Sequence, residues 1–313
     1  MTPEQLRALV AELAGALRER VLPHLGSHAG RAHGGEAPGG DVTFAIDADA
    51  EEYLADWVAA RAPGVAFFSE DAGLVEPSGS ADWVLVVDPI DGTRPAMAGF
   101  EMACVSVAAA PLDDEPRMSD VTAGCVVEIK SGNRFVAGRG EGVQADVPVR
   151  PSANASLDRL FWTYGLRGRP ARETMEVLGE LVDRSSVGGG TFELGSAAYD
   201  LTRVVTGQLD AYIEPGPRLV AEVPGMRAAF ERVGGGGVLN NSPYDPAAGA
   251  LCAWESGAVL TDCAGAPLGD RPLLGSGADY QMSVLAAANP QLHELLLAEV
   301  ERGLERLRKR VEG

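Results

Sequence analysis

Apolar positions follow two different periods along this chain. From Leu6 to Val21 they recur every three to four residues, which predicts an amphipathic helix over residues 3–22. The same spacing predicts helices over residues 48–62 and from residue 290 onward. Between these helices, short runs of β-branched and other apolar residues predict strands near residues 65 and 84 and over residues 104–109, 123–129 and 133–137.

The pattern changes near Arg150. Before it, predicted strands follow one another after the first two helices, whereas strand and helix signals alternate after it. We therefore predict an α+β fold of two closely packed domains, residues 1–150 and 151–313. The chain has 313 residues, 46% of them hydrophobic, which is enough for one large core or two ordinary ones.

The strand predicted near residue 84 runs directly into two carboxylates. Because Pro89 cannot donate a ladder hydrogen bond, we expect the strand to end there. Asp88 and Asp91 then lie together at a strand end, and the carbonyl oxygen of Ile90 offers a third ligand. Oxygen donors in a small site suit a hard divalent cation such as Mg²⁺.

A phosphate site is predicted beside these carboxylates. Gly92 allows the chain to approach a ligand closely, and a helix that begins at Thr93 would present free N–H groups to an anion. A second interpretation stays open, because Asp-Pro and Asp-Gly pairs are also ordinary turn formers.

More carboxylates stand beside other predicted elements. Glu70 and Asp71 directly follow a short apolar run. Asp245 is predicted at a helix N-cap, with Pro246 in the first helical position, and Asp47 precedes the second predicted helix. Asp47 and Asp245 could each be no more than a helix cap.

In their order along the chain, these elements resemble the signature of the inositol monophosphatase superfamily. This superfamily comprises Mg²⁺-dependent, lithium-sensitive phosphatases, including fructose-1,6-bisphosphatases. The resemblance runs from the first helix into the last hundred residues. It rests on the Asp47 segment, Ser69-Glu70-Asp71, Asp88-Pro-Ile-Asp91-Gly-Thr93, Gly195-Ser196-Ala197-Ala198 and Tyr244-Asp245-Pro-Ala-Ala-Gly249. It implies a layered αβαβα sandwich, usually a homodimer, with a flexible loop over residues 26–40 that closes over the site.

The resemblance also implies a metal site for two to three Mg²⁺ ions. One ion would bind Glu70, Asp88 and the Ile90 carbonyl, a second would bind Asp88, Asp91 and Asp245, and Glu70 would reach a weaker third. One ion would lower the pKa of bound water while another shields the leaving oxygen.

The catalytic group implied by the resemblance is Asp47, Glu70 and Thr93. Thr93, oriented by Asp47, would position and deprotonate the attacking water, and the amides of Gly92 and Thr93 would bind phosphate. Hydrolysis would then be direct and in line, with no phosphoenzyme.

Three positions depart from the family pattern. Pro95-Ala96 replaces the usual Asn-Phe, Tyr244 replaces a Trp, and Asp71 replaces a Glu. None of these changes removes a predicted metal ligand. Asp71 is expected to contact the metal ligands and not the metal itself, and its shorter side chain alters any such contact.

The substrate is expected to meet the second half of the chain. By resemblance, the helix start at Gly195, Ser196 and Ala197 lines a sugar or polyol, and Glu214 contacts its hydroxyl groups. Glu214 could equally be a surface carboxylate at a strand end.

An unusually long segment follows Glu214. Thirty residues separate it from Asp245, more than a typical inositol monophosphatase has there, which favours a lid or specificity loop. Within it, Arg218 is a candidate contact for a second phosphate or carboxylate, and Arg227 and Arg232 are alternatives.

Charge and composition limit the classes of binding partner and the compartment that this chain suits. The net charge of −19 argues against nucleic acid and anionic membranes, because both need a basic surface. Four cysteines without Cys-x-x-Cys spacing favour reduced thiols, and no run is long enough to span a bilayer. A cytoplasmic protein whose partner is a small phosphorylated metabolite is the expectation.

We therefore predict a Mg²⁺-dependent phosphomonoesterase for a small sugar, cyclitol or related alcohol phosphate, such as inositol monophosphate or fructose 1,6-bisphosphate. Histidinol phosphate, adenosine bisphosphate and a pathway-specific nucleoside or sugar phosphate are alternative substrates. A noncatalytic sensor of a phosphorylated metabolite or metal, built on the same scaffold, is the alternative from another class.

Overall fold

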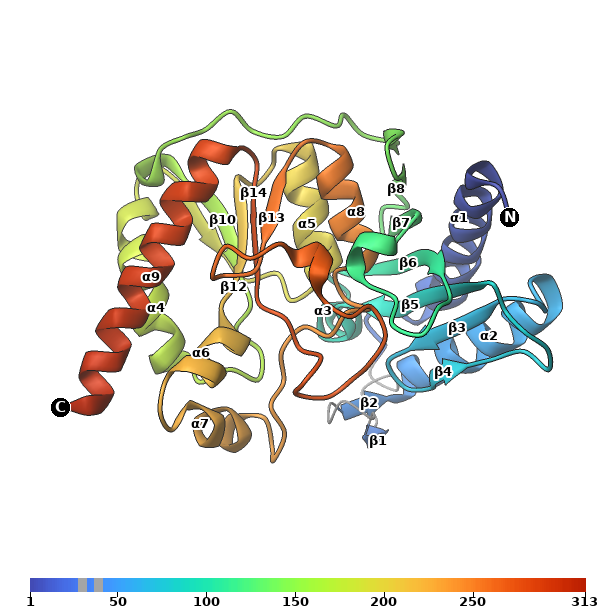
Figure 1. The fold of residues 1–313 in the computed structure, drawn as a ribbon, viewed down its shortest axis with the longest axis horizontal. Coiled ribbons are helices and arrows are strands. Elements are labelled where there is room, and N and C mark those ends of the chain that lie inside the picture. Colours follow the sequence, from blue (N-terminus) through green and yellow to red (C-terminus); the bar gives the residue numbers. More distant parts are fainter. Residues whose placement is uncertain (28–32, 37–41) are drawn as a thin grey trace.

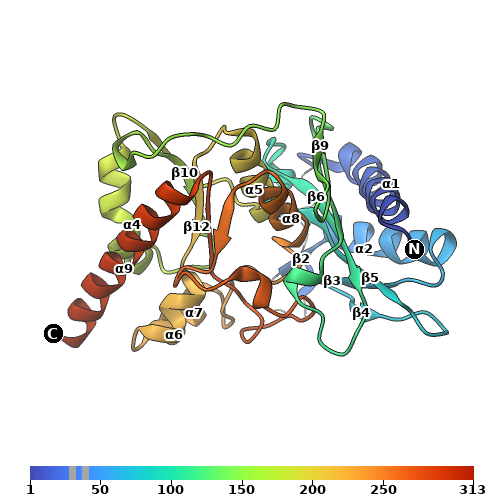
Figure 2. The same ribbon diagram turned by 45° about the horizontal axis from the view of Figure 1, so that its top comes forward.

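The computed structural model describes residues 1–27, 33–36 and 42–313, and these form five layers in the order αβαβα (Figures 1 and 2). The layered sandwich predicted from the sequence is confirmed. Two sheets are separated by a layer of two helices, and each sheet is covered on its outer face by two more.

The larger sheet has seven strands in the order β4-β3-β5-β6-β7-β8-β9. All neighbours pair antiparallel except β3 and β5, which are parallel. Its strands are β3 (Ala66–Ser69), β4 (Gly73–Val75), β5 (Trp83–Asp91), β6 (Cys104–Pro111), β7 (Ala123–Glu128), β8 (Arg134–Gly138) and β9 (Gly142–Ala145).

Helices α1 (Pro3–Val21) and α2 (Ala45–Arg61) cover the outer face of this sheet. The periodic apolar side chains of α1 are buried there against alternate residues of the central strands, which is the reason for their helical spacing. Thr2 caps α1 through its side chain and Pro3 stands in the first turn. The predicted first helix is thus confirmed almost to the residue.

The middle layer consists of α5 (Ala197–Thr206) and α8 (Ala247–Glu255), which contact each other and both sheets. Small residues allow this close packing: Gly124 of β7 lies against Ala248, and Gly249 lies against Ala198. A side chain at either glycine would approach the neighbouring helix to about 3.1 Å. Helix α8 therefore sits directly on the larger sheet.

The second sheet has five strands in the order β11-β10-β12-β14-β13. They are β10 (Phe161–Tyr164), β11 (Gly190–Phe192), β12 (Ala211–Glu214), β13 (Val259–Thr261) and β14 (Val284–Ala287). Helices α4 (Ala171–Ser185) and α9 (Pro290–Glu312) pack on its outer face. The apolar stripe predicted after residue 290 is buried in this contact.

Shorter elements complete the chain. They are β1 (His33–Glu36), β2 (Val42–Phe44), α3 (Thr93–Ala98), α6 (Gly216–Glu222), α7 (Met226–Val233) and the 3₁₀ turns Leu22–His24, Met118–Asp120, Leu157–Arg159 and Leu268–Asp270. The change from one sheet to the other falls between Ala145 and Phe161, in a connection that crosses the top of Figure 1 in green. This interval includes the predicted boundary near Arg150.

Three boundary predictions are wrong. The second helix begins at Ala45, so Asp47 lies in its first turn. Asp245 precedes the cap of α8, which is Pro246. Strand β5 continues through Pro89 to Asp91, because Pro89 lies where the register with β6 is interrupted and no ladder donor is required.

The predicted loop over residues 26–40 is described only in part. Residues 28–32 and 37–41 lie outside the described residues, and β1 pairs antiparallel with β2. Among the described residues, no helix combines the length and apolar character needed to cross a membrane.

A buried ion pair connects the larger sheet to the middle layer. Arg203 of α5 pairs with Glu128 of β7, and both side chains are at most 10% exposed. We expect Arg203→Met to lower the free energy of unfolding by about 3–5 kcal/mol, because it leaves the buried Glu128 carboxylate without its cation. Urea unfolding measures this.

Arg184→Met is the matched control. Arg184 pairs with Asp158 at the surface, where both side chains are about half exposed, so its loss should cost less than about 1 kcal/mol. Equal effects of the two substitutions would contradict a structural role for the buried pair.

Candidate metal and phosphate site

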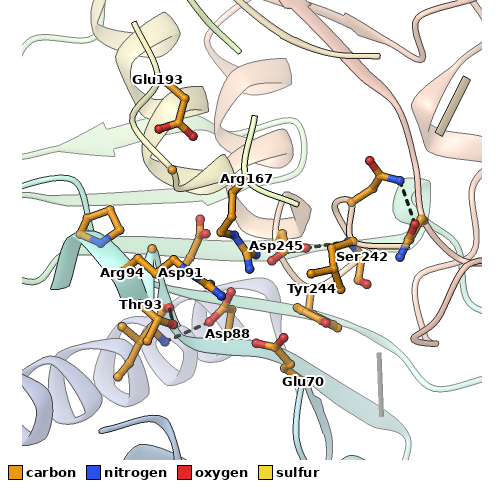
Figure 3. Close-up of a pocket in the computed structure, with 17 residues that line it drawn as sticks. Glu70, Asp88, Asp91, Thr93, Arg94, Arg167, Glu193, Ser242, Tyr244 and Asp245 are labelled. Carbon is orange, nitrogen blue, oxygen red and sulfur yellow. Dashed lines mark hydrogen bonds between the residues drawn. The ribbon is translucent and has the colours of Figure 1, made fainter. Parts of the chain in front are cut away.

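Three carboxylates meet between the two sheets. Ligand oxygens of Asp88, Asp91 and Asp245 all lie within 4.8 Å of one another (Figure 3). Asp88 and Asp91 come from the end of β5, and Asp245 comes from the turn that leads into α8. The structure thus brings together side chains more than 150 residues apart in the sequence, as predicted.

A bulge in β5 makes the first two point the same way. Side chains three positions apart on a regular strand face opposite sides of the sheet. Asp88 lies opposite Ser106 and Asp91 lies opposite Cys104, so the two residues between them on β5 lie opposite a single residue of β6. The extra residue in the Pro89–Ile90 stretch restores a common face.

Asp91 is fixed by the start of α5. Its Oδ2 accepts hydrogen bonds from Ser196 Oγ at 2.8 Å and the Ala198 amide at 2.6 Å, and its Oδ1 accepts one from the Ala197 amide at 3.3 Å. These contacts give Ser196 and Ala197 a definite place behind the carboxylate, while Gly195 lines the cavity. Their predicted contact with substrate stays a prediction.

The other two carboxylates are held by backbone donors. The Ile90 amide donates to Asp88 Oδ1 at 3.0 Å, and the Ser242 amide donates to Asp245 Oδ2 at 2.6 Å. Burial and mutual repulsion raise the pKa of Asp88 well above its usual range. Burial also raises the pKa of Asp91 to about 6 and that of Asp245 to about 7.

This donor set fits a divalent metal. Buried carboxylates that repel one another need positive charge to stay ionised at neutral pH, and hard oxygen ligands are what Mg²⁺ prefers. Glu70 and Ile90 line the same cavity, and Figure 3 shows the Glu70 carboxylate beside Asp88.

The predicted water-activating pair is in contact. Thr93 Oγ1 lies 3.0 Å from Asp47 Oδ1 and 3.2 Å from the Ile90 carbonyl oxygen. The Phe44 amide donates to the other Asp47 oxygen at 2.9 Å. Asp47 therefore holds its own helix start and the Thr93 hydroxyl at the same time, and its role in activating water stays a prediction.

Gly92 has no room for a side chain. Its φ is +92°, and a Cβ atom there would lie 2.6 Å from the Met102 carbonyl oxygen and 3.0 Å from Ser196 Cβ. Helix α3 begins directly after it at Thr93, as predicted. The requirement for glycine thus comes from packing against the segment before β6 and the N-cap of α5, as well as from the turn.

A support for Glu70 was missed in the sequence. Glu51 of α2 accepts a hydrogen bond from Ser69 Oγ at 2.7 Å, and the Asp71 amide lies 3.5 Å from its other oxygen. Burial raises the pKa of Glu51 to about 7. Its spacing of four residues from Asp47, on the same face of a helix, is the signal that would have found it.

The cavity has a volume of about 140 Å³ and contains three charged residues that were not predicted. They are Arg94, Arg167 and Glu193. Figure 3 shows Arg94 and Arg167 extending toward the carboxylates from two different segments. The positive charge of Arg167 partly offsets the raised pKa of Asp91 and Asp245. Arg167 follows the end of β10, a position that marks binding loops in sheets with parallel strands.

Two predicted substrate residues lie elsewhere. Glu214 is fully buried and paired with Arg169, and neither residue lines the cavity. Arg218 pairs with Glu222 and Glu301 and lines a different hollow. Neither Glu214 nor Arg218 lies at the carboxylate cluster, because each forms an ion pair elsewhere.

A carboxylate cluster between the sheets of an αβαβα sandwich, with a threonine and an aspartate beside it, defines the class of metal-dependent phosphatases that the sequence resembles. Residues 3–305 match the model of the Inositol monophosphatase family. The chain belongs to this family, and it is a phosphoric monoester hydrolase.

Relatives cover nearly the whole chain. An inositol-1-monophosphatase of Mycobacterium leprae is 30% identical, over 96% of this chain and 94% of the relative. A fructose-1,6-bisphosphatase/inositol-1-monophosphatase of Methanothermobacter thermautotrophicus is 27% identical, over 84% of each chain. The crystal structure of the extragenic suppressor protein suhB from Bartonella henselae shares the fold, with a TM-score of 0.71 at 20% identity over 96% of this chain and 99% of that one.

The raised carboxylate pKa values predict how stability depends on pH. In EDTA, Asp91 and Asp245 bind protons more tightly in the folded chain than in the unfolded one, where the pKa is near 3.8. Their contribution to stability is therefore lost as pH rises from about 4 through about 7. The melting temperature without metal should fall over this range.

Metal addition and one substitution complete this test. Saturating Mg²⁺ at pH 7.5 should restore the melting temperature, because it binds the ionised carboxylates of the folded state only. Asp245→Asn should flatten the pH dependence. A metal-free melting curve that is independent of pH in both proteins would contradict the buried cluster.

Proposed function

We propose that this chain hydrolyses a small phosphomonoester in a Mg²⁺-dependent reaction in which water attacks phosphorus directly. The observation that carries the proposal is the convergence of Asp88, Asp91 and Asp245 within 4.8 Å, next to the Thr93–Asp47 hydrogen bond. A noncatalytic sensor would need the first feature but has no use for the second.

The proposed metal ligands are Glu70, Asp88, the Ile90 carbonyl, Asp91 and Asp245. When bound, Mg²⁺ would lower the pKa of water and stabilise the charge on the phosphoryl and leaving oxygens. Two or three ions are proposed from the family resemblance.

The chain's own groups would orient and deprotonate the water. The Thr93 hydroxyl donates to Asp47, which leaves its oxygen lone pairs to accept a hydrogen bond from the attacking water. As the water's proton moves to Thr93 Oγ1, the hydroxyl's own proton would pass to Asp47. The Gly92 and Thr93 amides, at the start of α3, would orient the phosphate. Asp71 stays a proposed support for Glu70, together with Glu51.

The lining of the cavity favours a substrate with a second anionic group. With two divalent ions bound, Arg94 and Arg167 would give the cavity more positive charge than its five carboxylates can neutralise. Glu214, the residue proposed to meet a neutral polyol, is instead closed off by Arg169. A sugar bisphosphate therefore suits this cavity better than a monophosphate of an uncharged polyol.

Three further properties are proposed on sequence grounds alone. They are a homodimer, residence in the cytoplasm and inhibition by lithium. The absence of nucleic acid and membrane partners belongs with them.

Substitutions at the metal ligands and at the water-activating pair should have different effects on turnover and on Mg²⁺ binding. Asp91→Asn and Asp245→Asn should lower turnover by orders of magnitude and weaken Mg²⁺ binding, whereas Thr93→Ala should lower kcat about a hundredfold with Mg²⁺ affinity nearly unchanged. Phosphate release and Mg²⁺ calorimetry measure the two effects. Asp49→Asn, at a partly exposed carboxylate of α2 that pairs with Arg20, is the control. Full turnover in Asp91→Asn would refute the metal assignment.

The arginines should control substrate choice. Arg94→Gln and Arg167→Gln should each lower kcat/KM for fructose 1,6-bisphosphate about tenfold more than for fructose 1-phosphate. Only the bisphosphate has a second phosphate, so only this substrate loses a charged hydrogen bond to the arginine. Arg172→Gln, at an exposed position of α4, should leave the ratio unchanged. An unchanged ratio in both cavity variants would exclude this preference.

A further inference from the structure

A second hollow lies beside the first. Its volume is about 370 Å³, which is in the range of small-molecule sites, and none of the proposed metal ligands lines it. One wall is formed by α6, α7 and the stretch that follows, and the other by the turns that flank β13 and β14. The long segment after Glu214 therefore forms one wall of a second cavity.

Three of the six charged residues that line this hollow are engaged inside the protein. Arg218 pairs with Glu222 at 2.7 Å, and Glu222 also pairs with Arg308. Asp262 Oδ1 accepts hydrogen bonds from the Ala264 and Ala266 amides, both at 2.8 Å. These contacts fix the positions of the three side chains along the wall.

Among the residues that the structure describes, two arginines of this lining have no carboxylate partner. Within the described part of the chain, Arg227 forms no ion pair or side-chain hydrogen bond. Arg271 donates from Nη2 to the Gln281 carbonyl at 3.0 Å, but its buried Nε has no partner. The remaining carboxylate of the hollow, Asp279, is exposed. Three arginines and three carboxylates line the hollow, so its lining is close to neutral in a chain of net charge −19.

The hollow shares a wall with the catalytic cavity. Asn240 and Gln281 line both spaces, and Asn240 Nδ2 donates to Gln281 Oε1 at 3.0 Å. Gln281 is 5% exposed and also donates to the Val238 carbonyl. Arg271 donates to the backbone carbonyl of this same glutamine, so the arginine and the catalytic cavity both contact Gln281.

We propose that this hollow binds a small anionic metabolite through Arg227 and Arg271, and that its occupancy alters substrate binding through the Gln281–Asn240 pair. The ligand is a carboxylate or phosphate ester, because the planar guanidinium fork matches both groups. The site is separate from the proposed catalytic function, and its binding is measurable without activity.

Calorimetry on the full chain in EDTA tests the site. Inorganic phosphate and succinate are the two probes, and binding of one, the other or both identifies the ligand chemistry. Wild type and Arg232→Gln, a control at an exposed position of α7, should bind at least one probe with equal affinity. Arg227→Gln and Arg271→Gln should each weaken that binding at least tenfold.

Other outcomes overturn the proposal. Failure of wild type to bind either probe does so, as does equal binding by both arginine variants. Binding that is lost in Arg167→Gln but kept in Arg271→Gln would place the anion in the catalytic cavity instead.

Kinetics tests the coupling. With Mg²⁺ in excess, saturating succinate or sulfate, matched to the probe that binds, should change KM for the phosphoester at least threefold in wild type and not in Arg227→Gln. Arg227 lies outside the catalytic cavity, so its basal kcat should be unchanged. Binding with no effect on KM or kcat would overturn the coupling, and absence of all phosphatase activity would refute the proposed function while the calorimetric result stands.

Discussion

The site depends on keeping three carboxylates close together in a place with little water. Each buried negative charge costs several kcal/mol unless it is compensated, and neighbours of the same sign increase that cost. The fold meets part of it with N–H and O–H donors, of which the start of α5 gives Asp91 three. The remainder calls for cations, and this one requirement explains both the metal dependence of the family and the presence of Arg94 and Arg167 in the cavity.

The same requirement organises the surrounding backbone. Two carboxylates three residues apart can share a face only because β5 carries an extra residue, and Pro89 fits there because the bulge needs no donor. The packing of Gly92 against the segment before β6 and the N-cap of α5 then holds the turn in place. Local irregularity is thus part of the function of this strand end.

Local chemistry explains why much of the site was predictable. Asp88, Asp91, Thr93 and Asp245 lie in short strings whose residue types carry the signal, and the stripe of α1 needs only periodicity. Glu214 was expected to contact substrate, but it does not line the cavity. It pairs instead with Arg169, a residue distant in the sequence, and no local pattern reveals that partner. Arg167 was overlooked for the converse reason, since a lone arginine in a turn has no signature until the fold places it beside carboxylates.

The connection of residues 146–160 has a consequence for assembly. Asp88 and Asp91 precede it and Asp245 follows it, and the donors that hold Asp91 also come from beyond it. Neither fragment of a chain cleaved in this connection would contain the complete carboxylate cluster. A bound ion would therefore be ligated by both fragments. Their reassociation would be thermodynamically linked to metal concentration.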